Sequence, residues 1–206
     1  SHLPADCRIG IAPHSLRATS PEDLDTILIV EGHGSVHIHI AEQPKEVAEV
    51  QEGLGARPIE WLLHNAPVNH RWCLIHATHM IEADTIAMAA TGTVAGLCPV
   101  TEANLGDGPC NGPAYLNAGG AFGIGADSNV LISLTEELRT LEYSQRLRDL
   151  SRNVMVRGEG SIGQTLYCGA ATGGAQALDR QAGEIAEGML ADLVAIDTSR
   201  PALCAL

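Results

Sequence analysis

The sequence predicts an α/β fold in which helices cover a parallel β-sheet. Apolar, strand-like runs alternate with amphipathic segments, and the runs recur roughly every 25–35 residues, as in βαβ units. Of the 206 residues 45% are hydrophobic, yet only 3% are aromatic and 22 are glycine. Small aliphatic side chains must therefore form the core, which is typical of buried parallel strands.

Five segments have the composition of strands: Cys7–Ala12, Val36–Ala41, Trp72–Ala77, Thr93–Cys98 and Phe122–Ala126. In the second of them apolar and polar residues alternate. Because strand side chains repeat every two residues, His37 and His39 lie on the same face.

Predicted helices fill the gaps: Pro21–Val30, Pro44–Gly53, Pro58–His64, Ile81–Ala90, a short helix near Tyr115, Leu134–Leu150 and Ser161–Leu178. The first helix has a complete start signal. Ser20 can cap it, Pro21 fits its first turn, and Glu22 faces the positive end of the helix dipole.

This order of elements leaves a doubly wound sheet or a (β/α)8 barrel. No glycine-rich dinucleotide loop follows any strand, which disfavours the nucleotide-binding version. Polar residues instead follow the strands at their carboxyl ends, where barrels have their active sites. Near the end of the chain, Gly183–Ile185 and Met189–Asp197 predict short strands of a small β domain.

The formal net charge of −13 argues against binding to nucleic acid or to an anionic membrane. It is compatible with a small acidic substrate, because one arginine can dominate a pocket. The six cysteines include no CxxC pair, which is typical of reduced thiols in a cytoplasmic protein. No apolar run approaches the ~20 residues of a membrane span.

Ionisable side chains stand at successive strand ends: His14, then His39 and Glu42, then His76, and finally Asp127. A hydrolytic metal site needs neutral nitrogen or carboxylate ligands, an open water position and a base for the proton of that water. A single histidine at a strand end is more often structural, and an aspartate there can simply cap a helix. Recurrence at several strand ends favours a functional site.

His14 and Arg17 share one turn after the first predicted strand. Arginine recognises a carboxylate through two parallel hydrogen bonds, so Arg17 is a candidate for binding an acidic substrate. A surface salt bridge is an equally good interpretation. The polar segment Thr101–Gly108 either lines the pocket or is a plain connecting loop.

Together these residues resemble the amidohydrolase superfamily, and within it the formimidoylglutamate deiminases. The resemblance runs through almost the whole chain, although Val100 and Asn129 depart from the pattern. The segments that carry it are Ala12–Arg17, His37–Gln43, Trp72–His79, Gly96–Pro99, Thr101–Gly108, Gly125–Ser128 and Glu142–Arg148.

The resemblance implies a role for each candidate residue. His39 and Asp127 would bind a single divalent metal ion, for which zinc fits the donor types. Glu42 would shuttle protons between the water and the leaving nitrogen. His76 would help to polarise the attacking water, and Asp127 would also accept its proton.

The implied reaction is hydrolysis of a C=N bond in histidine degradation: N-formimidoyl-L-glutamate and water give N-formyl-L-glutamate and ammonia. His14 and Arg17 would hold the formimino and glutamate groups, so the expected partner is a small substrate with carboxylates. A homodimer is implied for the full-length protein.

The resemblance begins at the fourth barrel strand. It implies a partial (β/α)8 barrel, strands four to eight, in residues 1–180, and the start of a small β-sandwich domain in residues 181–206. The family's first strand carries a His-x-His metal pair, whereas His37-Ile38-His39 is the fifth-strand motif. We therefore expect a fragment that is inactive alone, because His39 and Asp127 are fewer than the usual three protein ligands.

Two other functions are open at this point. Another deaminase or chlorohydrolase of the superfamily would act on a guanine-, cytosine-, adenosine- or triazine-like ring, although the aromatic partners for stacking such a ring are scarce here. A catalytically inactive barrel fragment would serve only as an interaction module. Metal content and turnover separate these functions.

Overall fold

The structure, a computed structural model, describes residues 4, 7–30, 33–128 and 131–200. One four-stranded parallel sheet has the order β1-β2-β3-β4, formed by Val36–Ile40, Trp72–His76, Val94–Leu97 and Ala121–Ile124. Each strand overlaps a predicted one. The predicted fold class, a partial barrel with a parallel sheet, is confirmed.

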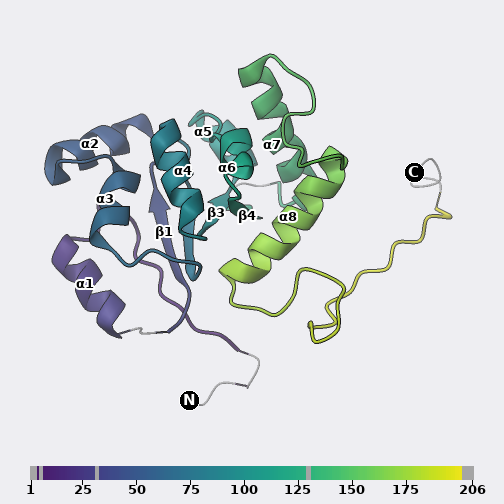
Figure 1. The fold of residues 1–206 in the computed structure, drawn as a ribbon, viewed down its shortest axis with the longest axis horizontal. Helices are drawn as coiled ribbons and strands as arrows, with labels where there is room; N and C mark the ends of the chain where they lie inside the picture. Colours follow the sequence, from purple (N-terminus) through teal and green to yellow (C-terminus); the bar gives the residue numbers. More distant parts are fainter. Residues whose placement is uncertain (1–3, 5–6, 31–32, 129–130, 201–206) are drawn as a thin grey trace.

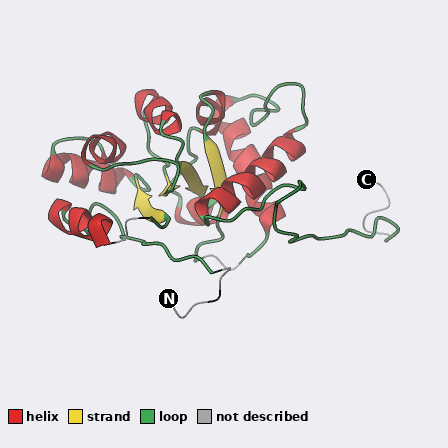
Figure 2. Cartoon of the chain, turned by 60° about the horizontal axis from the view of Figure 1, so that its bottom comes forward, coloured by secondary structure: helices red, strands yellow, loops and turns green. Residues whose placement is uncertain are grey.

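Eight helices accompany the strands in this part of the chain: α1 Pro21–Val30, α2 Pro44–Leu54, α3 Pro58–Asn65, α4 Glu82–Ala90, α5 Pro99–Leu105, α6 Gly112–Asn117, α7 Leu134–Asp149 and α8 Ile162–Ala177. Figure 1 shows α1 to α3 at one end of the molecule and α7 and α8 at the other. Figure 2 shows the strands side by side between the helices. Among the described residues, no helix is both long and apolar enough to cross a membrane.

A large apolar cluster covers one face of the sheet, and a smaller apolar cluster lies on the other face beside the histidines of β1. Val36, Ile38 and Ile40 of β1 are buried, and they pack in one cluster with Leu62 of α3 and Met88 of α4. The alternate residues of β1 are half-buried histidines on the opposite face. The predicted alternation is therefore confirmed, and it places both histidines on the face opposite the large cluster.

The predicted strand Cys7–Ala12 was wrong. This segment lies beside β1 but makes only isolated bridges, Ile11 to Val36 and, beyond its end, Ser15 to His39. The His37 N–H donates to the Ile11 carbonyl at 2.9 Å. The next bond of a parallel ladder would come from residue 13, and Pro13 has no N–H to give.

The polar segment Thr101–Gly108 is not a plain loop, because its first half belongs to α5. This helix begins with Pro99 in its first turn and ends at Gly106, which adopts a left-handed φ of 74°. Proline at the start and glycine just after the end are the usual boundaries of a helix. Only the last residues of the predicted loop connect elements.

The short strands predicted at Gly183–Ile185 and Met189–Asp197 are absent from the described chain. These residues form turns and extended segments, and most of them are exposed. Figure 1 shows this stretch running away from the body of the molecule. A strand needs a partner along its length, and here the described residues make only isolated backbone bonds, such as that from the Leu190 N–H to the Gln181 carbonyl at 2.7 Å. The division into domains at residue 180 stays a prediction.

Helix α8 packs closely against β4, and its end reaches β1. A Cβ on Gly173 would overlap the backbone of Phe122 in β4, whereas one on Gly174 would meet nothing within 4 Å. Nε2 of His37 lies 2.8 Å from the carbonyl oxygen of Ala177. His37 therefore has a structural role in joining α8 to β1.

This packing gives a prediction about stability. Gly173→Ala should lower the free energy of unfolding by about 1–3 kcal/mol, because overpacking forces α8 away from β4. The matched control, Gly174→Ala, should be neutral or stabilising by up to about 1 kcal/mol, because alanine favours a helix interior. Urea unfolding of both variants measures the difference, and equal midpoints would contradict the packing.

Candidate active site at the carboxyl ends of the strands

Strand β1 places His39 near the carboxyl end of the sheet. Its Nδ1 lies 2.8 Å from the carbonyl oxygen of His14. A carbonyl oxygen can only accept, so Nδ1 carries the proton and the neutral ring keeps a lone pair on Nε2. This is the form in which a histidine oriented by a backbone carbonyl binds a metal.

His76 ends β2 and lies among three carboxylates, although its side chain is only 1% exposed. Its Nδ1 is 3.4 Å from Oε1 of Glu102, while its Nε2 is 3.7 Å from Oε1 of Glu42 and 3.9 Å from Oδ2 of Asp127. Burial lowers the pKa of His76, but the hydrogen bond to Glu102 and the three negative charges outweigh burial. The pKa is consequently raised above its ordinary value.

Three imidazole rings form a row at this end of the sheet. The ring centroids of His14 and His39 are 5.1 Å apart, and those of His39 and His76 are 5.6 Å apart. The bridge between Ser15 and His39 holds the first of these rings beside β1. The predicted site residues His14, His39 and His76 thus lie together although they belong to three separate segments.

The turn after β1 holds the backbone of Glu42 in a fixed position. The N–H groups of Ala41 and Glu42 each donate to one carboxylate oxygen of Glu46 at 2.8 Å. Glu46 is buried, with 2% of its surface exposed. Water therefore competes little for these bonds, and the Glu42 side chain starts from a rigid position beside His76.

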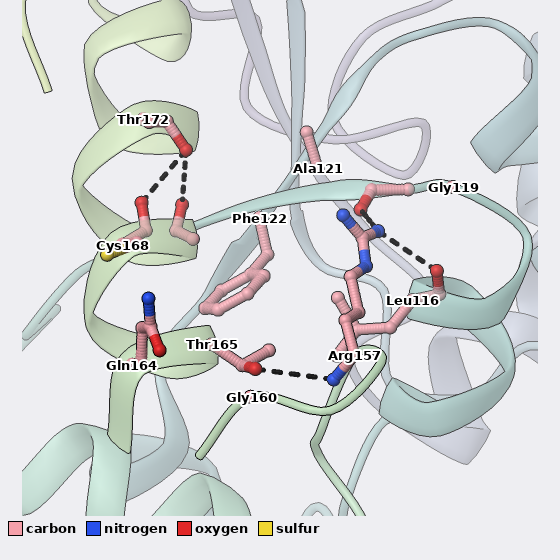
Figure 3. A pocket seen from close by; sticks show the side chains of 12 residues that line it. Leu116, Gly119, Ala121, Phe122, Arg157, Gly160, Gln164, Thr165, Cys168 and Thr172 are labelled. Carbon is pink, nitrogen blue, oxygen red and sulfur yellow. Dashed lines mark hydrogen bonds between the residues drawn. The ribbon is translucent and has the colours of Figure 1, made fainter. Parts of the chain in front are cut away.

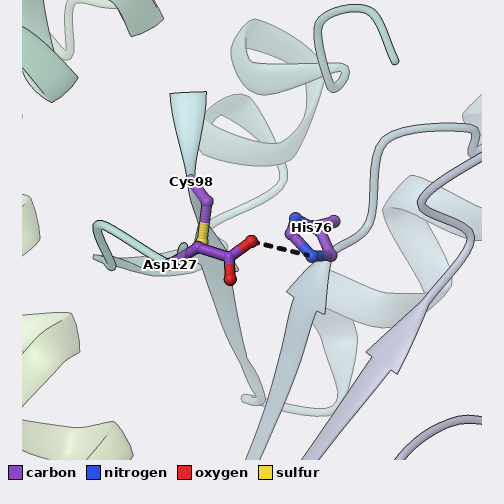
Figure 4. Close-up of side chains that lie close together, drawn as sticks. All are labelled: His76, Cys98 and Asp127. Carbon is purple, nitrogen blue, oxygen red and sulfur yellow. Dashed lines mark ion pairs between the residues drawn. The ribbon is translucent and has the colours of Figure 1, made fainter. Parts of the chain in front are cut away.

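Asp127 reaches the site from the loop after β4. Figure 4 shows its carboxylate directed toward His76, with the sulfur of Cys98 close by. One ligand-type atom from each of these three residues lies within 4.8 Å of the others. Burial, together with the charges of Glu102 and Asp127, raises the pKa of Cys98, so its sulfur is a neutral thiol. His76 and Asp127 contribute a ring nitrogen and a carboxylate to this group.

Left-handed backbone conformations gather around these residues. Ala41, His76, Ala77 and Asp127 have φ values of 51°, 68°, 48° and 50°. Such a conformation in a residue other than glycine costs on the order of 1–3 kcal/mol and persists where the surroundings impose it. Its occurrence after three of the strands is typical of a functional site.

The sequence pattern described as the amidohydrolase family matches residues 3–206. The chain belongs to this family. The resemblance found from the motifs is therefore confirmed, and the strand ends described above are where barrel enzymes have their active sites.

Several known amidohydrolases and deaminases are similar to this chain. A formimidoylglutamate deiminase of Pseudomonas aeruginosa is 52% identical over 198 residues, which are 95% of this chain and 44% of that protein. The crystal structure of an amidohydrolase from Brucella melitensis is 53% identical, with a TM-score of 0.85 over 88% of this chain and 41% of that one. An adenosine deaminase from Xanthomonas campestris, solved with bound zinc, is 27% identical, with a TM-score of 0.82 over 91% of this chain and 43% of that one. The chain thus spans less than half the length of these relatives.

Arg17 is the predicted site residue that this amidohydrolase chain does not bring to the histidine row. Its Nη1 lies 3.5 Å from Oε2 of Glu49 on α2, and its side chain is 34% exposed. Lys45 also approaches Glu49, at 3.6 Å. An exposed pair of this length contributes little to stability, so another carboxylate could replace Glu49 at modest cost.

Glu102 is the site residue that sequence reasoning missed. It was noted in the polar segment after β3 but was assigned no role. The available signal was local, because Pro99 begins a helix and places Glu102 one turn along it, facing back to Cys98. Its Oε1 accepts a hydrogen bond from the Cys98 N–H at 3.0 Å as well as lying near His76.

A separate cavity of about 400 Å³ lies at the opposite, amino end of β4. Figure 3 shows Arg157 crossing it between α8 and the segment before β4. The guanidinium donates to the carbonyls of Leu116 at 2.9 Å and Gly120 at 2.7 Å. This arginine is thus occupied with backbone groups, and none of the predicted site residues lines the cavity.

Proposed function

We propose that the whole protein is a metal-dependent deiminase that hydrolyses N-formimidoyl-L-glutamate to N-formyl-L-glutamate and ammonia, a step of histidine degradation. The proposal rests on one observation: the carboxylates of Glu42 and Asp127 both lie within 4 Å of Nε2 of His76, whose ring stacks on that of His39. The 52% identity to the Pseudomonas aeruginosa deiminase supports the choice of substrate.

The donor set fits a divalent metal. His39 presents the unprotonated Nε2 that a metal needs, and Asp127 adds a carboxylate. The zinc bound in the related adenosine deaminase supports zinc as that ion. When bound, the metal would lower the pKa of a water molecule and so supply a nucleophile near neutral pH. A third ligand would complete the usual set of protein donors.

The remaining residues would transfer protons from the water to the leaving nitrogen. Water adds to the formimidoyl carbon, its oxygen becomes the formyl oxygen, and the C–N bond to the terminal nitrogen breaks. Asp127 would accept one proton of the water and Glu42 the other, and both protons would pass to the terminal nitrogen, Glu42 acting as the shuttle, so that this nitrogen leaves as ammonia. Their oxygens lie 3.7 and 3.9 Å from Nε2 of His76, beyond direct hydrogen-bond distance, so one water molecule beside these groups could contact them together.

Arg17 would hold a substrate carboxylate. We propose that this carboxylate takes the place of Glu49, whose contact with Arg17 is long and half exposed to solvent. His14, at the outer end of the histidine row, would contact the formimino group. Both residues precede β1 and reach the same end of the sheet through the bridge at Ser15.

The test is ammonia release from N-formimidoyl-L-glutamate by the whole protein and by two variants. Arg17→Met should lower kcat/KM by about 100-fold, because a charge-assisted bidentate contact is lost. Lys45→Met is the matched control, because it removes a neighbouring positive charge to which we assign no role in substrate binding. It should change kcat/KM by less than about 3-fold.

Other outcomes would redirect the assignment. A parent protein that contains metal but releases no ammonia from this substrate would favour a ring deaminase, which the likeness to the Xanthomonas campestris adenosine deaminase makes the second candidate. Release of ammonia from adenosine would then identify the ring. A parent protein without metal or turnover would instead indicate an interaction module.

A further inference from the structure

We infer that Glu102 is a positioning residue that fixes the tautomer and orientation of His76. The inference rests on the proposed function, because it assigns His76 to the reaction. Nδ1 of His76 lies 3.4 Å from Oε1 of Glu102. An ionised carboxylate only accepts hydrogen bonds, so Nδ1 carries the proton.

This tautomer determines what the opposite nitrogen can do. In the neutral ring Nε2 is left with a lone pair, and it faces Glu42 at 3.7 Å and Asp127 at 3.9 Å. A lone pair there can accept a hydrogen bond from the attacking water, whereas an N–H could not. The wrong tautomer of a catalytic histidine is expected to lower turnover strongly even when the fold is intact.

Glu102 is itself held rigidly enough to set this geometry. The same Oε1 accepts the Cys98 N–H at 3.0 Å, and only 4% of the residue is exposed. Glu137 of α7, 1% exposed, accepts the Val100 N–H at 2.8 Å and thereby fixes the first turn of α5. Two buried carboxylates thus connect α7 through α5 to His76, with little competition from water.

A purely structural role, in which Glu102 only caps the Cys98 N–H, makes different predictions. Glu102→Gln retains an oxygen that accepts from both donors, whereas Glu102→Leu removes it at similar size. If Glu102 positions His76, the leucine variant should lose about 100-fold in kcat with KM and bound metal unchanged. The glutamine variant should recover to within about 10-fold of the parent, because the Cys98 N–H keeps its oxygen facing His76.

The matched control is Glu142→Leu. Glu142 is another buried glutamate: its carboxylate accepts from the Val154 and Met155 N–H groups and from Arg146, and none of these bonds involves His76. This variant should lose stability while the folded protein keeps its kcat. Equal losses of kcat in Glu142→Leu and Glu102→Leu would overturn the inference, because any buried carboxylate would then have the same effect.

A spectroscopic measurement tests the tautomer without relying on turnover. In the whole protein labelled with ¹⁵N-histidine, the two ring nitrogens of His76 should show a protonated Nδ1 in the parent and in Glu102→Gln. In Glu102→Leu this preference should disappear. A neutral parent ring whose proton is on Nε2 and not on Nδ1 overturns the inference even if the leucine variant fails to fold. Failure of the proposed substrate would leave the ¹⁵N result unaffected, so the two proposals fail separately.

Discussion

Replacing Asp127 by asparagine is expected to lower kcat for ammonia release by about 1,000-fold or more, and to reduce the bound metal at the same time. We assign Asp127 two functions, binding the metal and accepting a proton from the water. Its side chain, 30% exposed, lies beside His76. Asparagine has a similar shape but no charge. It would therefore bind a cation weakly and could not take a proton from water.

The control for this prediction is Ser128→Ala. The Ser128 hydroxyl donates to Oδ1 of Asp127 at 3.3 Å, and both residues lie at the surface of the loop after β4. Removing this single bond should cost less than about 10-fold in kcat and leave the metal in place. Metal content by elemental analysis and kcat by an ammonia assay report the two functions separately. An Asp127→Asn variant with the metal and turnover of the parent would contradict both roles.

The sequence predicted the strands well because their signal is local. Alternation in Val36–Ile40 and the apolar run Trp72–His76 follow directly from burial of one or both faces. The first strand was predicted wrongly because of Pro13. Its missing N–H removes a bond to β1, and the sequence alone does not show that residue 13 would have to make that bond. The strands predicted after residue 182 are absent for another reason. Their residues have strand-like composition, but no strand of the described chain lies beside them.

The candidate site was predicted in part. The sequence proposes His14, His39, Glu42, His76 and Asp127 because barrel enzymes use the carboxyl ends of their strands, and the structure brings these strand ends together. Glu102 and the partner of Arg17 depend on contacts between elements. The approach of Glu102 to His76 requires the parallel pairing of β2 and β3, and Glu49 is 32 residues away from Arg17. No periodicity in the sequence reports such contacts.

Glu42→Gln should separate proton transfer from metal binding. We expect kcat to fall by about 100- to 10,000-fold with the metal content unchanged, because we assign Glu42 to proton delivery and not to the metal. The geometry favours a clean result. Glu46 holds the backbone of residue 42 through the N–H groups of Ala41 and Glu42, and neither bond involves the side chain that is replaced. Glutamine should therefore occupy the position of Glu42 and lack only the carboxylate that can take up and release a proton.

The matched control is Glu52→Gln, which removes an exposed carboxylate from the same helix that carries Glu46. It should change kcat by less than about 2-fold, since a distant exposed charge is screened by solvent. The decisive comparison is between Glu42→Gln and Asp127→Asn. If Glu42→Gln also loses the metal, then Glu42 is a ligand and a different residue must deliver the proton, for which His76 is the nearest group. If Glu42→Gln keeps both metal and turnover, the leaving nitrogen receives its proton elsewhere and the assignment of Glu42 is wrong.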